Sequence, residues 1–135
     1  MVLLLMKKLF STKSRCKYYL KCHLVIVTKY RRNLINEEIS ESLKRIFLEI
    51  SSSSDFLVEE VESDVNHFHL LISYPPNISV TAVVRKLKQL STVSLWKYYP
   101  NYLSQHYWGK KVLWSSGYFV CSIGDANEDR IREYI

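Results

Sequence analysis

Two histidines, His67 and His69, flank one aromatic residue in a run that reads as a buried β-strand. Side chains alternate between the two faces of a strand, so both imidazoles project from one face, whereas Asn66, Phe68 and Leu70 project from the other. Two imidazoles held side by side are easiest to understand if together they bind a divalent metal ion. The pair is a weak signal by itself, and ordinary polar strand residues are the alternative.

Charge and composition point to an anionic partner. The chain has 135 residues, enough for one domain with its own core, and 47% of them are apolar. Nineteen basic residues against 13 acidic ones give a net charge of +6, which favours nucleic acid as the first candidate. Ten tyrosines, five phenylalanines and three tryptophans could stack on unpaired bases, or could simply fill the core.

The cysteines and the N-terminus indicate a cytoplasmic protein. Cys16, Cys22 and Cys121 form no C-x-x-C pair and are odd in number, which argues against a zinc module or a disulfide framework. The apolar residues 1–6 are too few to span a bilayer, and they precede Lys7 and Lys8, the reverse of the order in a secretory signal. We therefore expect no membrane partner.

The hydrophobic pattern predicts one domain over residues 1–135, in which strands and helices interleave. Strands are expected at 16–28, 56–61, 67–74 and 117–123, and helices at 36–50, 79–96 and from 125 onward. A tyrosine-rich connection covers residues 98–108. The order β-α-β-β-α-β-α favours an α+β sandwich of the ferredoxin-like or RNA-recognition-like kind, with an antiparallel sheet. One sheet face would carry helices, and the histidine face would be open to a ligand.

Both internal helices have an apolar stripe at helical spacing. In the first the stripe is Ile39, Leu43, Ile46, Phe47 and Ile50. In the second, Val80, Val83, Leu87 and Leu90 should face inward, with Arg85, Lys86 and Lys88 largely outward.

Two basic clusters flank the predicted sheet. The first is Lys29, Arg31 and Arg32 with Tyr30 among them, and the second is Arg85, Lys86 and Lys88. Solvated surface is the commoner role of such clusters, but their mixture of charge and aromatic rings also suits a nucleic-acid backbone.

Several motifs together resemble one family, the small single-tyrosine transposases (TnpA-like) encoded by insertion sequences that move as single-stranded DNA. Residues 67–72 are similar to its His-hydrophobic-His (HUH) signature. Further matches are its first strand with a basic exit (22–32), its second helix (86–91), its Trp-x-x-x-Tyr-Phe strand (112–120, followed by Gly124) and the start of its catalytic helix (132–135).

The resemblance implies that Tyr134 attacks a phosphodiester of single-stranded DNA and forms a 5′-phosphotyrosine. It further implies that His67 and His69 hold Mg²⁺ or Mn²⁺, that the DNA is marked by hairpins, and that the protein is a homodimer in which the tyrosine helix can serve the partner's histidines. The basic residues Lys29, Arg31, Arg32, Arg85, Lys86 and Lys88 would then bind DNA.

Two positions depart from the family pattern. The residue before the first histidine is usually Asp and is Asn66 here, and the chain ends before the glutamine that follows the tyrosine by four residues and completes the metal site. We therefore expect this 135-residue chain to bind hairpins but to cleave them slowly or not at all. The rival interpretations are a non-catalytic module that binds single-stranded DNA or RNA on the same fold, and a metal-dependent nuclease without a covalent step.

Overall fold

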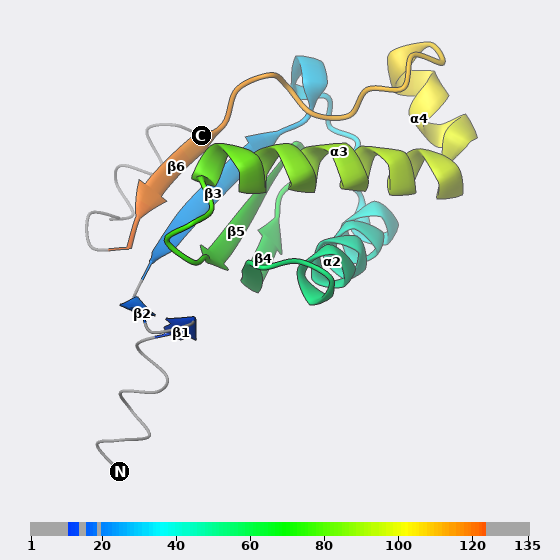
Figure 1. The fold of residues 1–135 in the computed structure, drawn as a ribbon. Coiled ribbons are helices and arrows are strands. Elements are labelled where there is room, and N and C mark those ends of the chain that lie inside the picture. Colours follow the sequence, from blue (N-terminus) through cyan, green and yellow to red (C-terminus); the bar gives the residue numbers. More distant parts are fainter. Residues whose placement is uncertain (1–10, 14–15, 19, 124–135) are drawn as a thin grey trace.

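The computed structural model describes residues 11–13, 16–18 and 20–123, shown in Figure 1. Its elements are β1 (Ser11–Lys13), β2 (Cys16–Tyr18), β3 (Lys21–Val27), the 3₁₀ turn η1 (Lys29–Arg31), α2 (Glu37–Ser52), β4 (Leu57–Ser63), β5 (His67–Ser73), α3 (Val80–Tyr98), α4 (Pro100–Tyr107) and β6 (Phe119–Ser122). The predicted last helix, and Tyr134 within it, lie outside the described residues.

A four-stranded sheet in the order β4-β5-β3-β6 forms the centre of the fold, and every neighbouring pair in it is antiparallel. This confirms the predicted ferredoxin-like α+β arrangement. Most boundaries lie within two residues of the prediction, and two segments differ by more. The single strand expected at 16–28 is divided, because β2 pairs with β1 in a separate two-stranded sheet and only β3 joins the main one. The connection expected at 98–108 contains α4, which begins at Pro100, a residue suited to a helix's first turn.

Helices α2 and α3 cover one face of the sheet (Figure 1). Phe68, Leu70 and Ile72 of β5 point to that side and are almost completely buried, as the alternation predicts. The ring of Phe68 meets Phe47 of α2 at a centroid distance of 5.4 Å and Trp114 at 6.1 Å. The residues after α4 therefore contribute to the same core as the sheet and α2.

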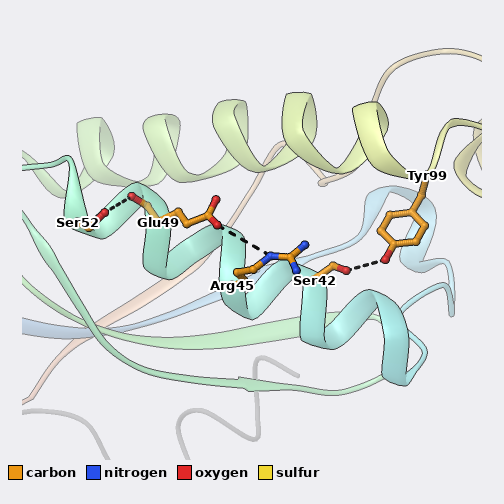
Figure 2. A network of polar contacts seen from close by, with 5 residues as sticks. All are labelled: Ser42, Arg45, Glu49, Ser52 and Tyr99. Carbon is orange, nitrogen blue, oxygen red and sulfur yellow. Dashed lines mark hydrogen bonds and ion pairs between the residues drawn. The ribbon is translucent and has the colours of Figure 1, made fainter.

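The first predicted helix forms as expected. Asn36 caps α2, its Oδ1 accepting the backbone N–H of Ile39 at 2.8 Å, and the whole predicted apolar stripe is buried. Figure 2 shows polar contacts made by the same helix. The hydroxyl of Ser42 lies 2.7 Å from that of Tyr99, so it links α2 to the end of α3. The 3.9 Å ion pair between Arg45 and Glu49 is exposed and contributes little to stability.

The second predicted helix differs from expectation at Leu90 and at two lysines, since Lys86 is half-buried as well as Lys88. Leu90 was expected to point inward but is 40% exposed, whereas Val84 is buried in its stead. Lys88 was expected to point largely outward but is half-buried. Its ammonium donates to the carbonyl oxygens of Ser115 at 2.7 Å and Gly117 at 2.9 Å, because the chain after α4 runs back along this side of α3. Within the described part of the chain, no helix is both long and apolar enough to cross a bilayer.

Candidate functional site

The two histidines lie side by side, as the strand alternation predicts. Their ring centroids are 5.1 Å apart on β5. In the pairing of β5 with β3, His67 stands opposite Val27 and His69 opposite Val25. His67 is only 7% exposed and His69 is half-buried, so this face is less open than expected. One reason is that the chain leaving β3 folds back against the start of β5, where the backbone N–H of Thr28 donates to the Asn66 carbonyl at 2.9 Å.

Asn66 occupies a different place from the one predicted. It precedes β5, which begins at His67 as predicted, but its side chain does not point away from the histidines: its Oδ1 lies 2.8 Å from Nδ1 of His67. When the Nδ1–H of His67 donates to that amide oxygen, Nε2 is left as the free acceptor. The amide thus fixes one ring nitrogen and leaves the other for a ligand, which is the usual way in which a metal-binding imidazole is oriented.

Both imidazoles are kept neutral. Burial lowers the pKa of His67, an effect that Arg31 reinforces and the carboxylate of Asp64 opposes. Burial also lowers the pKa of His69, with a further contribution from the neighbouring His67. Because a metal ion binds the neutral imidazole, both side chains are in the ligand form at pH 7.

The described residues supply two candidate metal ligands here and no complete set. No group of three His, Cys, Asp or Glu side chains in residues 11–13, 16–18 and 20–123 is placed to hold a metal ion. His67 and His69 therefore fit a divalent ion as two nitrogen donors, with the remaining positions open to other oxygen or nitrogen ligands.

The turn that follows β3, residues 28–32, is fixed to the histidine strand and to the chain after α4. Thr28 is fully buried, and its hydroxyl donates to the Arg32 carbonyl at 2.8 Å. The N–H of Lys29 donates to the Leu113 carbonyl at 2.8 Å. Tyr107, at the end of α4, donates its hydroxyl to the carbonyls of Lys29 and Leu113, at 3.0 and 3.2 Å.

This turn adopts backbone conformations that side chains usually avoid. Tyr30 has φ 61° and Arg31 has φ 50°, both in the left-handed region. Such a residue costs about 1–3 kcal/mol and persists where its surroundings fix it, which the hydrogen bonds of Thr28, Lys29 and Tyr107 do here. Strain of this kind concentrates at functional sites.

The first basic cluster lies on this turn. Arg31 is exposed and close enough to His67 to disfavour its protonation. The guanidinium carbon of Arg32 lies 5.3 Å from the ring centre of Trp108, and the ammonium of Lys29 lies 5.5 Å from that of Tyr30. The structure thus gathers the predicted residues of this cluster next to one of the predicted metal ligands.

The second basic cluster does not form one patch. Arg85 is exposed and, with Lys88 and Lys111, lines a groove of about 550 Å³ between α3 and residues 111–116. The ammonium of Lys86 instead lies 5.9 Å from the ring centre of Phe56. Arg85 and Lys88 therefore face one side of α3, and Lys86 faces another.

Sequence reasoning missed several residues that shape this site. Thr28, Tyr107 and Trp108 act through hydrogen bonds or ring contacts to residues far away in the chain, whereas Asn66 acts on its neighbour His67. Of the three with distant contacts, Trp108 carried a local signal, because it precedes Gly109, which takes a φ of 80° at the end of α4.

Comparison with known proteins identifies the same family by a family model and by individual relatives. Residues 16–135 match the family model described as "Transposase IS200 like". The chain is 30% identical over 118 residues to the ISDra2 transposase TnpA of Deinococcus radiodurans, covering 87% of this chain and 83% of the relative. It is 28% identical over 129 residues to the transposase for insertion sequence element IS200 of Salmonella typhimurium, covering 96% and 80%.

Two solved structures are similar to this fold. A crystal structure of a Deinococcus radiodurans R1 protein assigned as a transposase aligns with a TM-score of 0.81 and 27% identity, over 92% of this chain and 95% of the other. A REP-associated tyrosine transposase bound to a REP hairpin aligns with a TM-score of 0.54, over 93% and 68%. The second pair is 15% identical, so that likeness concerns the fold alone.

The two cations of the groove should respond differently to substitution. Lys88→Met leaves the carbonyls of Ser115 and Gly117 without their donor, so we expect a loss of about 1–3 kcal/mol in the free energy of unfolding. Arg85→Ala, the matched control on the exposed rim, should change it by less than about 0.5 kcal/mol. Urea unfolding followed by circular dichroism measures both, and equal effects would contradict the structural role of Lys88.

Tyr107→Phe should reveal how the turn is held. Loss of the hydroxyl should cost about 0.5–1.5 kcal/mol at pH 7. Burial raises the pKa of Tyr107 to about 12, whereas an unfolded tyrosine ionises near 10. The unfolded state therefore loses its proton first, so the advantage of wild type over Tyr107→Phe should be constant below about pH 9 and shrink as the pH rises through 10 toward 12. Urea titrations at several pH values test this, and an advantage that grows above pH 10 would contradict it.

Proposed function

The chain belongs to the IS200-like transposase family, and from that premise we propose that it cleaves and rejoins single-stranded DNA through Tyr134 with the help of His67 and His69. The observation that carries the proposal is the pair of neutral, adjacent imidazoles beside a strained cationic turn. In a family of enzymes that rearrange DNA, two such imidazoles could act at the phosphodiester that is cut. The role of Tyr134 is inferred from the sequence resemblance alone, because this residue lies outside the described residues.

The proposed step is a transesterification. The phenolic oxygen of Tyr134 forms a bond to phosphorus, the bond from phosphorus to the 3′-oxygen breaks, and that oxygen takes up a proton to become a 3′-hydroxyl. The phenol gives up its proton in the same step, and the strand downstream of the cut stays on the protein, joined through its 5′-phosphate as a phosphotyrosine. Because one phosphodiester replaces another, the reverse attack by a 3′-hydroxyl rejoins DNA without ATP. A tyrosine is mostly neutral at pH 7, so its attack requires activation.

His67 and His69 would hold the divalent ion, which we propose to be Mn²⁺ or Mg²⁺. Two nitrogen ligands suit Mn²⁺ better than Mg²⁺, which prefers oxygen. When bound there, the cation would offset charge on the scissile phosphate. The amide of Asn66 would keep Nε2 of His67 pointed at the ion by holding Nδ1.

Lys29, Arg31 and Arg32 would bind the phosphates that lead to this point, because they extend from a turn fixed beside His67. Arg85, Lys86 and Lys88 are weaker candidates for a shared DNA track, since they diverge around α3 and Lys88 already donates to two carbonyls. We propose DNA hairpins as the marked substrate. The fold neighbour bound to a REP hairpin supports this choice, as does the family resemblance.

A protein–DNA adduct tests the proposed function. The full chain is incubated with Mn²⁺ and a labelled hairpin carrying a single-stranded flank, and the mixture is run on a denaturing gel. We expect a shifted covalent band that is absent with Tyr134→Phe, because this change removes the nucleophilic oxygen. His69→Ala should lose the band and the binding of Mn²⁺ together. An adduct that persists in Tyr134→Phe would exclude Tyr134 as the nucleophile.

The same assay addresses the rivals and the proposed homodimer. Hairpin binding without any adduct would favour the non-catalytic module, and cleavage without an adduct would favour a hydrolytic nuclease. If the tyrosine of one protomer serves the histidines of its partner, a mixture of His69→Ala and Tyr134→Phe proteins should regain part of the adduct. Each variant alone is the control, and no recovery would mean that each protomer uses its own tyrosine.

A further inference from the structure

Two large aromatic side chains are exposed, Tyr30 on the turn of residues 28–32 and Trp108 at the end of α4, which packs against that turn. Trp108 is 76% exposed and Tyr30 is 64% exposed, whereas the other two tryptophans, Trp96 and Trp114, are 6% and 7% exposed. Exposed rings of this size lose the favourable burial that the core gives their counterparts. Their position therefore calls for a ligand that covers them.

Both rings are presented by left-handed backbone. Tyr30 has φ 61°, and Trp108, at the end of α4, has φ 52°. The backbone around each is fixed: the N–H of Arg31 donates to the Thr28 carbonyl at 2.9 Å, and the N–H of Trp108 donates to the Ser104 carbonyl at 2.8 Å. A flexible loop could relax such conformations, so their retention indicates that the rings are held outward by the fold.

The two presenting segments form one structural unit. The ring of Tyr30 lies 6.4 Å from that of Tyr107, the residue next to Trp108, and the hydroxyl of Tyr107 donates to the Lys29 carbonyl at 3.0 Å. Arg32 provides a second link between the turn and the end of α4, because its guanidinium carbon lies 5.3 Å from the centre of the Trp108 ring.

Cations accompany both rings. The ammonium of Lys29 lies 5.5 Å from the centre of the Tyr30 ring. The Nε of Arg32 is buried and has no hydrogen-bond acceptor among the described residues, so the guanidinium would bind an anionic ligand through its terminal nitrogens. Aromatic faces beside cationic donors match the chemistry of an unpaired nucleotide, which has a flat base and a charged phosphate.

We propose that Tyr30 and Trp108 form a stacking platform for unpaired bases of the DNA strand that leads to His67 and His69, with Arg32 binding an adjoining phosphate. The proposal rests on the proposed function for its choice of DNA as the ligand. It assigns to these rings a task distinct from phosphate binding, since they hold bases of the single-stranded flank in register with the histidine pair. Stacking needs a base whose flat face is free, so the platform selects unpaired over paired DNA. Every base has such a face, so the platform tolerates any sequence.

Tryptophan fluorescence of the full chain provides a direct readout, because Trp108 is the exposed tryptophan of the three. The probes are a hairpin with a ten-nucleotide single-stranded flank, the same hairpin with an abasic flank, and a blunt hairpin. We expect the flank that carries bases to quench the emission and to bind more tightly than the abasic flank. The abasic and blunt hairpins should leave the emission nearly unchanged.

Substitution then separates stacking from charge. Trp108→Leu and Tyr30→Leu should each weaken binding of the base-carrying flank by about five- to a hundredfold and remove its preference over the abasic flank, with no change for the blunt hairpin. Trp108→Phe should keep most of the preference. Tyr98→Leu is the matched control, because Tyr98 is 59% exposed with the ammonium of Lys97 6.0 Å from its ring centre but lies at the end of α3.

The outcomes distinguish the two proposals. Wild-type protein that binds the hairpins but treats base-carrying and abasic flanks alike would overturn the platform and leave DNA binding intact. The same holds if Trp108→Leu behaves like Tyr98→Leu. Failure of the wild type to bind any of the hairpins would overturn the proposed function and the platform with it.

Discussion

The pairing of β3 with β5 is the constraint on which the site depends. Its register sets Val27 opposite His67 and Val25 opposite His69, and it buries Phe68 and Leu70 on the helix side. A slip by one residue would turn both imidazoles toward the helices and expose the apolar side chains, so burial of one face fixes the position of the other. The register also ends where the turn of residues 28–32 begins, which brings a cationic segment to the first histidine.

The remaining polar contacts extend this constraint outward from the sheet. Thr28 ties the turn to Asn66, and Asn66 in turn holds one nitrogen of His67. Tyr107 connects the same turn to α4, and Lys88 anchors residues 115–117 to α3. The strained backbone at Tyr30 persists because these contacts surround it. A rigid frame of this kind suits chemistry that needs a phosphate at a fixed distance from its ligands.

Local patterns predicted the parts of the fold that follow from periodicity. Strand alternation placed His67 and His69 together, and helical spacing identified the buried stripe of α2. The sequence could not indicate that Lys88 bonds two distant carbonyls or that Leu90 is exposed, because the contacts of Lys88 depend on where the chain after α4 lies and the exposure of Leu90 depends on how α3 is set on the core. The orientation of the Asn66 side chain could not be predicted either, because strand alternation does not apply to a residue that precedes the strand. Contacts between distant segments, in contrast to periodicity, leave no pattern in a single sequence.

The proposed function depends on a divalent-metal site formed by the two imidazoles of β5 next to the cationic turn. Its most direct test is paramagnetic broadening by substoichiometric Mn²⁺ in the ¹H–¹⁵N spectrum of the labelled chain. We expect amides of residues 25–28 and 67–69 to broaden first, while those at the far end of α3, near Tyr98, stay sharp. Broadening at exposed acidic residues of α2, such as Glu37 and Glu38, with none in β5 would contradict a metal site at His67 and His69.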